Sequence, residues 1–475
     1  MVWLVAALLV FIFQIATILI LEYRKPAKTV AWLLILFVLP IIGFVMYYFL
    51  AQEYRHRRRV RKQGVIAREV QLQALRRSVL VNRPTDMDNP AFHHQERLFN
   101  LLSSFSMLPI TGCNVSEVLT NGDKTYSSML SAMEGARHHI HLDFYTFRSD
   151  ATGERFKEVL VRKASEGVEV RLIYDGVGSI DIRSSFVNEL RDAGVQVQCF
   201  LAPRIAFFDK RINYRDHRKI TVIDGTAGFV GGINIGDEYL GMDKKLGFWR
   251  DTHLRLEGDA VYYLQLIFMR DWWFTAREKL DDAVYMPEHR CRGTEQVQIV
   301  ASGPDSNADS VLESMFSAIA AATKRIYIAT PYFIPDHSVL MGLRTAALSG
   351  VDVRLILPHV SDSKLVMYAS LSYVQELLEA GVRIFRYRKG FLHAKVLIVD
   401  ELVAAVGTAN MDLRSFFSNF EINAMLYDKG AIRRLEQDFI QDLDDSYELN
   451  LHTYASRSRR QRAYEVVAHM LSPLL

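Results

Sequence analysis

One eighteen-residue pattern occurs twice in this chain of 475 residues, and it constrains the fold more than any other feature. The first copy, HRKITVIDGTAGFVGGIN, runs from His217 to Asn234, and the second, HAKVLIVDELVAAVGTAN, runs from His393 to Asn410. Each copy contains a histidine, a lysine two positions later, an aspartate five positions after the lysine, and small residues and an asparagine at its end. A pattern that recurs 176 positions later indicates two copies of one folding unit.

Segments around the two copies also match each other. Three pairs stand in the same order in each half: HIHLDFYTF (139–147) with RIYIATPYF (325–333), EGVEVRLIYD (166–175) with SGVDVRLILP (349–358), and AGVQVQCF (193–200) with AGVRIFRY (380–387). These segments are rich in valine and isoleucine, and the stretches between them are typical of helices that end at glycine. Alternating strands and helices predict an α/β fold with one sheet domain in each half.

The matched segments divide the chain into four predicted parts. Residues 93–287 and 288–475 are expected to form two α/β sheet domains in a pseudo-two-fold arrangement, with the stretch 288–307 joining them. Residues 1–50 are expected to form two transmembrane helices, and residues 51–92 a basic juxtamembrane linker.

The prediction of membrane helices rests on two apolar runs. Met1–Leu21 is interrupted only by Gln14 and Thr17, and Thr29–Leu50 contains Pro40, which is expected to kink a helix. Each run is close to the ~20 residues that cross a bilayer as a helix. A cleaved signal peptide fits less well, because no basic region precedes the first run and no small-residue cleavage site follows it.

Positive charges favour a cytoplasmic position for everything after the second run. The loop between the runs carries three basic residues, whereas the segment after the second run carries six, namely Arg55, Arg57, Arg58, Arg59, Arg61 and Lys62. Because basic residues flank membrane helices on the cytoplasmic side, this cluster predicts a multi-pass membrane protein with everything after the second run in the cytoplasm. The same cluster would attract anionic lipid head groups.

Composition excludes some classes of partner and metal site. The net charge of +3 gives no sign of the basic surface that a nucleic-acid partner would need. Cys113, Cys199 and Cys291 form no CxxC pair, so we expect reduced thiols rather than a disulfide framework or a zinc site. His139 and His141 share one strand face but lack a third ligand at sensible spacing, which favours a structural role.

The repeated motif places a histidine and a lysine where they can act on a phosphate. His217 and Lys219, like His393 and Lys395, are two positions apart and project from the same face of a strand. The lysine supplies positive charge for phosphate oxygens, and the histidine can attack phosphorus or donate a proton. If a pseudo-two-fold axis relates the halves, one histidine is the nucleophile of a two-step transfer and the other handles the proton. Four small residues are expected to let the backbone and the following asparagine approach the phosphate closely, namely Gly231, Gly232, Gly407 and Thr408.

Both copies fit the pattern H-x-K-x4-D-x6-G-[GST], so the chain resembles the phospholipase D superfamily. The resemblance implies that His217 is the nucleophile, that His393 is the general acid, and that both motif lysines hold the phosphate. It places Asp224 and Asp400 in the same catalytic set, where they act by hydrogen bonding and orientation. It assigns substrate binding and histidine orientation to residues after each motif, namely Asn234, Asn410, Asp251 and Glu421, with Glu238 as an alternative to Asp251.

The surroundings of the motifs resemble bacterial cardiolipin synthases over nearly the whole chain. The matching segments are AWLLILFVLPIIGFVMYYF, GGINIGDEYLG, FWRDTHLRLEG, TPYFIPD and LRSFFSNFEIN. This resemblance implies transfer of a phosphatidyl group from one phosphatidylglycerol to another, through a phosphatidyl-histidine, giving cardiolipin and glycerol. No cofactor and no metal are expected, because the lysines supply the positive charge that a metal would otherwise bring.

Several alternatives remain open from the sequence. A phospholipase D-type hydrolase differs only in using water as the acceptor, and another phosphatidyltransferase would use a different acceptor or donor lipid. A membrane-tethered nuclease and a non-catalytic membrane scaffold fit the sequence less well. Two further segments are hypothesised to contact lipid, the basic and aromatic stretch 204–212 and SRSRRQR at 456–462. The sequence predicts no particular oligomeric state.

Overall fold

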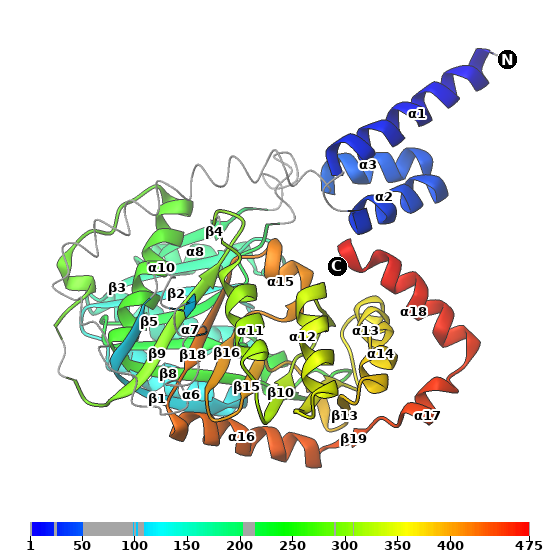
Figure 1. Cartoon of the computed structure of the whole chain (residues 1–475). Coiled ribbons are helices and arrows are strands. Elements are labelled where there is room, and N and C mark those ends of the chain that lie inside the picture. Colours follow the sequence, from blue (N-terminus) through cyan, green and yellow to red (C-terminus); the bar gives the residue numbers. More distant parts are fainter. Residues whose placement is uncertain are drawn as a thin grey trace.

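The structure is a computed structural model that describes residues 2–22, 26–50, 98, 101–102, 109–202, 214–288, 291–306 and 308–474 (Figure 1). Two regions with predictions lie outside the described residues. They are the basic linker 51–92 and the basic and aromatic stretch 204–212.

A single mixed sheet of fifteen strands runs through both halves of the chain. The first half contributes β1 (Ile110–Thr120), β2 (His139–Phe144), β3 (Glu169–Asp175), β4 (Gln196–Phe200), β5 (Lys219–Ile223), β6 (Ala227–Gly231) and β8 (Thr252–Gly258). The second half contributes β9 (Glu295–Ser302), β10 (Arg325–Ala329), β12 (Asp352–Pro358), β13 (Arg383–Tyr387), β15 (Val396–Val399), β16 (Val403–Gly407), β18 (Glu421–Leu426) and β19 (Ser446–Glu448). The predicted α/β fold is confirmed, and the sheets of the two halves are continuous.

The strand order repeats outward from the centre of the sheet. From β1 the first half runs β1-β8-β6-β5-β2-β3-β4, and from β9 the second half runs β9-β18-β16-β15-β10-β12-β13. The two central strands pair antiparallel, as a two-fold relation between the halves requires. Each motif therefore begins at an equivalent strand, β5 or β15, and both strands pair with neighbours on each side.

Helices cover both faces of this sheet (Figure 1). One face carries α10 (Asp259–Ala276) and α16 (Lys429–Asp444), whose apolar side chains share one buried core with strand residues from both halves. The other face carries α6 (Asn121–Glu134), α7 (Ala151–Ser165) and α8 (Ser184–Asp192) in the first half. In the second half it carries α11 (Ser310–Ala320), α12 (His337–Leu348), α13 (Lys364–Ser372) and α14 (Val374–Glu379). Burial on both faces explains why the strands are nearly continuous apolar runs.

The N-terminal residues form three helices, α1 (Val2–Glu22), α2 (Pro26–Val38) and α3 (Pro40–Leu50). The second apolar run folds back on itself, because the rings of Trp32 and Tyr47 lie 5.5 Å apart. In one straight helix these positions would be separated by about 22 Å. The prediction of a single helix over Thr29–Leu50, kinked at Pro40, is therefore wrong, because two helices pack against each other there. Pro40 interrupts the helix, because it lacks a backbone N–H and restricts the residue before it. Gly43 lets α2 and α3 approach each other, because a Cβ at this position would lie only 2.9 Å from the Ile35 carbonyl oxygen.

Within the part of the chain that the structure describes, no helix combines the length and the apolar character needed to cross a membrane.

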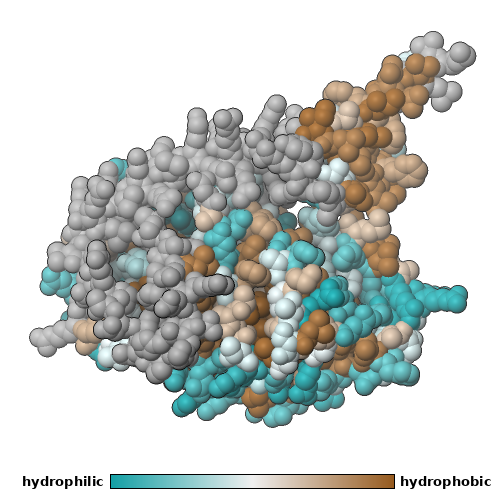
Figure 2. All heavy atoms as spheres, viewed as in Figure 1, coloured by the Kyte–Doolittle hydropathy of each residue, from teal (hydrophilic) through white to brown (hydrophobic). Residues whose placement is uncertain are grey.

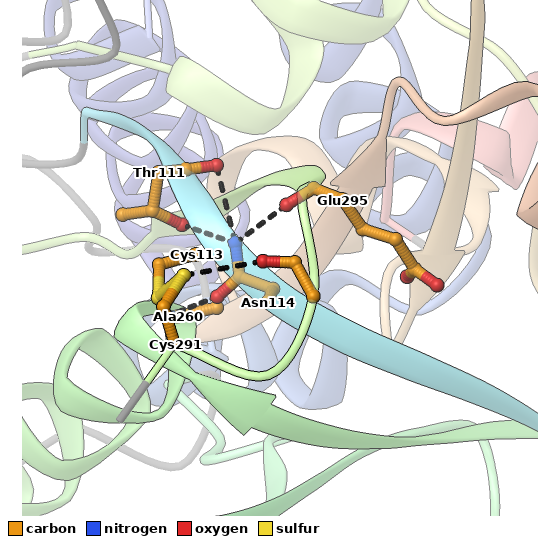
Figure 3. The surroundings of a disulfide bond; sticks show 7 residues. Thr111, Cys113, Asn114, Ala260, Cys291 and Glu295 are labelled. Carbon is orange, nitrogen blue, oxygen red and sulfur yellow. Dashed lines mark hydrogen bonds between the residues drawn. A yellow bond between two sulfur atoms is a disulfide. The ribbon is translucent and has the colours of Figure 1, made fainter. Parts of the chain in front are cut away.

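The segment between the halves is tied to the centre of the sheet by a disulfide (Figure 3). Cys113 in β1 bonds to Cys291, 178 positions later, which corrects the expectation that all the cysteines are reduced thiols. Cys199 is the free cysteine among the described residues. The predicted joining stretch 288–307 also contains β9, so eight of its twenty residues form a strand of the second half. Asn114 strengthens the junction, because its Nδ2 donates to the Thr111 and Glu295 carbonyls.

Candidate active site

Each motif histidine is held by a short segment from the opposite half of the chain. The backbone N–H of His217, just before β5, donates to the Phe420 carbonyl at 3.0 Å. The backbone N–H of His393, just before β15, donates to the Arg250 carbonyl at 2.7 Å. Phe420 and Arg250 each immediately precede the acidic residue predicted for their half. The repeat therefore contributes each histidine and its acidic partner from different copies.

Glu421, at the start of β18, is the partner of His217. The His217 Nδ1 lies 3.0 Å from both carboxylate oxygens of Glu421, which is fully buried. Burial lowers the pKa of His217 to about 4, so the imidazole is neutral near pH 7. Burial alone would raise the pKa of Glu421, but His217 and Lys219 bring it below its usual value. A neutral imidazole that donates from Nδ1 to a carboxylate keeps its Nε2 lone pair available for attack.

Asp251, between β7 (Phe248–Arg250) and β8, is the partner of His393. The His393 Nδ1 lies 2.7 Å from Asp251 Oδ2. Burial and the nearby ammonium of Lys395 lower the pKa of His393 to about 4. Glu238, the alternative to Asp251, lies instead beside Arg148, with 3.4 Å between the guanidinium and the carboxylate. The structure therefore places Asp251, and not Glu238, against a motif histidine.

The two motif lysines are buried beside the histidines. The Lys219 Nζ donates to the His217 carbonyl at 2.7 Å, and the Lys395 Nζ donates to the His393 carbonyl at 2.6 Å. Burial lowers the pKa of Lys219 to about 7 and that of Lys395 to about 8. The charge of Lys395 lowers the pKa of His217, and the charge of Lys219 lowers that of His393. The groups therefore interact as one site across the two halves.

The histidines differ in the surroundings of their rings. The Lys395 Nζ lies 2.9 Å from both the Nδ1 and the Nε2 of His393. Lys219 contacts only the backbone carbonyl of His217, and among the described residues the His217 Nε2 has no hydrogen-bond partner. The free lone pair of His217 is the difference that distinguishes two otherwise similar histidines.

One small residue at the end of each motif, Gly232 or Thr408, lies against the acidic residue of its own half. A Cβ at Gly232 would clash with the Asp251 Oδ1. At the matching position Thr408 donates its hydroxyl to the Glu421 Oε2 at 2.5 Å. The G-[GST] part of the pattern thus fits the carboxylate of its own half, which in turn holds the histidine of the other half. The expectation that the small residues let the phosphate approach closely stays a prediction.

The motif aspartates lie at the far end of their strands from the histidines. Five residues of strand separate Lys219 from Asp224, about 16 Å at strand spacing. The Asp224 carboxylate accepts the backbone N–H groups of three consecutive residues, Arg137, His138 and His139. The Asp400 carboxylate does the same for Thr323, Lys324 and Arg325. Each aspartate therefore fixes the entry to the neighbouring strand, β2 or β10, by hydrogen bonding.

The two motif asparagines are buried and make different contacts. The Asn234 Oδ1 accepts the Thr146 backbone N–H, and its Nδ2 donates to the Tyr239 hydroxyl, each at 3.0 Å. The Asn410 Oδ1 is buried and has no hydrogen-bond partner among the residues that the structure describes. Binding of substrate by both asparagines stays a prediction. Of the two, Asn410 has the side-chain oxygen that no described group engages.

Two aromatic side chains beside the histidines were missed by the sequence reasoning. The rings of Tyr145 and His217 lie 5.0 Å apart, as do those of Trp249 and His393. The Lys219 ammonium also lies 5.3 Å from the centre of the Tyr145 ring. Tyr145 lies in the matched segment HIHLDFYTF and Trp249 in FWRDTHLRLEG, but nothing in the spacing of either residue from the motifs marked it.

Three buried carboxylates near His217 are arranged closely enough to surround a cation. Asp143, Asp216 and Asp271 each present an oxygen within 4.8 Å of the others, and this is the one such group among the described residues. Arg218 already pairs with Asp271. Burial and the repulsion of neighbouring carboxylates raise the pKa of Asp143 and Asp216 well above the usual range. Protonated carboxyl groups around an arginine are poor metal ligands. The two histidines that were expected to be structural, His139 and His141, both contact Gln265 in the core. The absence of a metal from the chain stays a prediction.

Comparisons with known proteins show the family to which the chain belongs. The family described as "Cardiolipin synthase, PLD-like domain" matches residues 129–272 and 315–443, and "Phospholipase_D-nuclease N-terminal" matches residues 1–52. Cardiolipin synthase 2 of Bacillus anthracis is 45% identical over 465 residues, which are 98% of this chain and 90% of that protein. The chain belongs to the bacterial cardiolipin synthase family. The predicted resemblance to this family and to the phospholipase D superfamily is confirmed.

Other relatives give the same result. Cardiolipin synthase of Geobacillus sp. (strain WCH70) is 44% identical over 97% of this chain and 91% of that protein. The solved structure of phosphatidylserine synthase from Haemophilus influenzae Rd KW20 covers 81% of this chain and 96% of that chain, with a TM-score of 0.61. At 15% identity, that likeness concerns the fold alone.

Gly232→Ala tests whether the small residue serves the acidic partner of the opposite histidine. The added Cβ displaces Asp251 and with it His393, so we expect turnover of phosphatidylglycerol to fall at least about 100-fold in a folded protein. Gly112→Ala is the matched control, because a Cβ at Gly112 meets nothing within 4 Å and should leave turnover unchanged. Wild-type turnover by Gly232→Ala would contradict this role.

Proposed function

We propose that the chain is a phosphatidyltransferase that converts two molecules of phosphatidylglycerol to cardiolipin and glycerol. The observation that carries the proposal is the pair of histidines, each hydrogen-bonded to a buried carboxylate of the opposite half. Two equivalent imidazoles in one site suit a reaction in two steps, one through a covalent intermediate and one that releases it.

In the first step the His217 Nε2 attacks the phosphorus of one phosphatidylglycerol. A P–N bond forms, the bond between phosphorus and the glycerol oxygen breaks, and a proton passes from His393 to that oxygen. In the second step the free hydroxyl of another phosphatidylglycerol gives its proton to His393 and attacks phosphorus. The P–N bond breaks, which releases cardiolipin and restores neutral His217.

The lysines support both steps by electrostatics. Lys219 and Lys395 lie beside the histidines, and their charges lower the pKa of His393 in the unoccupied site. An anionic phosphodiester between them offsets these charges, so the pKa of His393 rises when substrate is bound and the imidazole can be protonated. The same positive charges stabilise the additional negative charge on the phosphoryl oxygens in the transition state. Asp251 and Glu421 keep the imidazoles oriented throughout.

The assignment of roles to the two histidines follows from their different surroundings. Lys395 lies within hydrogen-bond distance of the His393 Nε2, whereas the His217 Nε2 has no partner among the described side chains. A nitrogen whose lone pair is unengaged is the better nucleophile, which supports His217 for the attack on phosphorus.

We also propose that residues 1–50 anchor the chain in the bacterial cell membrane, so that the protein is an integral membrane protein. The catalytic halves then lie on the cytoplasmic side. Large apolar side chains of α1 are exposed, among them Leu9, Phe13 and Ile20. The basic cluster after residue 50 supports the cytoplasmic side. Anchoring keeps the second lipid substrate concentrated at the site, which favours a lipid alcohol over water as acceptor. Protease digestion of sealed inverted membranes tests the sidedness, since it should degrade the catalytic halves.

Product analysis tests the proposed reaction. The full-length chain in phosphatidylglycerol vesicles should form cardiolipin and glycerol in equal amounts, resolved by mass spectrometry. His217→Ala should lower the rate by at least about 1,000-fold, because no other group replaces the nucleophile. The exposed His337 offers the matched control, and His337→Ala should keep the wild-type rate. Phosphatidic acid as the main product would instead show a hydrolase, and a mixed product after addition of another lipid would show a different acceptor.

The pH dependence of kcat/KM follows from the pKa values of the free site. His217 must be neutral to attack and His393 must carry a proton, and the pKa of each is about 4 in the free site, so kcat/KM should fall below pH 4 and decline above it as His393 loses its proton. Lys219 and Lys395 must be charged, so the decline should steepen as the pH rises through about 7 and about 8. Initial rates at constant ionic strength measure this profile. A value of kcat/KM that stays constant up to pH 10 would contradict the role of the lysines.

A further inference from the structure

We infer that α18 (Arg459–Leu471) is a second membrane contact, which lies in the interface of an anionic bilayer with its outward face toward lipid. This inference rests on the proposed placement of residues 1–50 in the membrane. It adds a contact made by the catalytic body itself, near the C-terminal end of the chain.

The inward face of α18 is fixed to the body of the second half. The Tyr464 and Tyr368 rings lie 5.3 Å apart, and the His469 Nδ1 lies 2.9 Å from the Ser372 Oγ. Glu465 is buried on this face and pairs with Arg457 at 2.8 Å. The helix is therefore a rigid part of the fold, so whatever its outer face contacts sets the position of the catalytic halves.

The outward face of α18 is apolar although it is exposed. Val466 and Val467 are 58% and 53% exposed, and Met470 is 38% exposed. Positions 463, 466, 467 and 470 follow the spacing of one helical stripe, and all four are alanine, valine or methionine. A helix that faced water would carry polar side chains here. Within the described part of the chain, α13 and α2 contact α18, and the side chains of Val466, Val467 and Met470 stay exposed.

The charge of the helix complements an anionic surface. Its first four residues include Arg459, Arg460 and Arg462, and its first turn contains no acidic residue. Cations at a helix N-terminus oppose the helix dipole, so these arginines do not serve helix stability. From residue 451 to the end of the chain there are four arginines and one glutamate, a net charge of +3. An amphipathic helix with a basic end and an apolar face is typical of helices that lie in a membrane interface.

The position of α18 makes it continuous with the proposed membrane anchor. The short helix η4 (Ser472–Leu474) follows α18 and contacts α2, and Leu474 packs against the cluster that includes Trp32 and Leu36. In Figure 1, α18 extends to the N-terminal helices, and the C-terminus lies beside them. Figure 2 shows a mainly apolar surface over those helices, and hydrophilic side chains mixed with apolar ones over the coloured part of the body below them. The outward face of α18 therefore lies where an anchored chain meets the head groups.

Photo-crosslinking of the full-length chain tests the contact. We would place p-benzoylphenylalanine at Val467 and illuminate the protein in vesicles of phosphatidylglycerol and phosphatidylcholine. Phe13, 65% exposed on α1, reports the anchor, and Ile440, 40% exposed on α16, is the matched control on the body. We expect lipid adducts, identified by mass spectrometry, at positions 467 and 13 and none at 440.

The possible outcomes separate this inference from the anchor on which it rests. Adducts at 13 without adducts at 467 would overturn the α18 contact and leave the anchor intact. Adducts at neither position would overturn both. Adducts between two chains at 467 would show that another protein copy covers this face, and would also overturn the inference.

The arginines are tested by removing their charge. With Arg459→Gln, Arg460→Gln and Arg462→Gln combined, the yield of lipid adducts at 467 should fall at least about 5-fold in anionic vesicles. The KM for phosphatidylglycerol in vesicles should rise by a similar factor, whereas turnover of a dispersed short-chain phosphatidylglycerol should not change. Lys429→Gln with Arg433→Gln on α16 is the matched control and should change neither value. An unchanged yield in the triple variant would contradict the electrostatic part of the contact.

Discussion

The hydrogen bond between each motif histidine and a carboxylate of the other half is the interaction on which the site depends. His217 is oriented by Glu421, and His393 by Asp251, so neither half contains a complete pair of histidine and carboxylate. Backbone hydrogen bonds from the same histidines to Phe420 and Arg250 bring these segments together. The two copies of the motif are therefore not two sites but the two parts of one.

The continuous sheet explains how two distant segments meet with such precision. β1 and β9 pair at its centre, and the equivalent strands β8 and β18 flank them, so the acidic residues at their starts lie next to the junction. The core formed by α10 and α16 includes strand residues from both halves. A buried ion pair between Arg250 and Asp442, 2.7 Å apart, joins the halves beside the site. The positions of the motif histidines and their carboxylate partners therefore follow from the packing of the whole sheet.

Much of this arrangement could be predicted from the sequence, because duplication is visible in strand segments and motif spacing alike. His217, Lys219, His393 and Lys395 stand out by their pattern, and the acidic residues by the family resemblance. Which acidic residue faces which histidine could not be predicted, since spacing along the chain carries no information on contacts across the two-fold relation. The same holds for Cys113–Cys291, which lie 178 positions apart. The fold-back at Pro40 was missed because hydropathy does not distinguish a kinked helix from two packed ones.

The central claim is that one histidine bonds to phosphorus while the other handles protons. A phosphatidyl ester of p-nitrophenol tests it directly, because this leaving group departs without a proton. The His393→Ala variant should release one equivalent of p-nitrophenolate rapidly and then stop. Proteolysis after an alkaline quench, followed by mass spectrometry, should locate the phosphatidyl group on the peptide that contains His217. A phosphatidyl group on any other residue, or steady turnover with no adduct, would contradict the account.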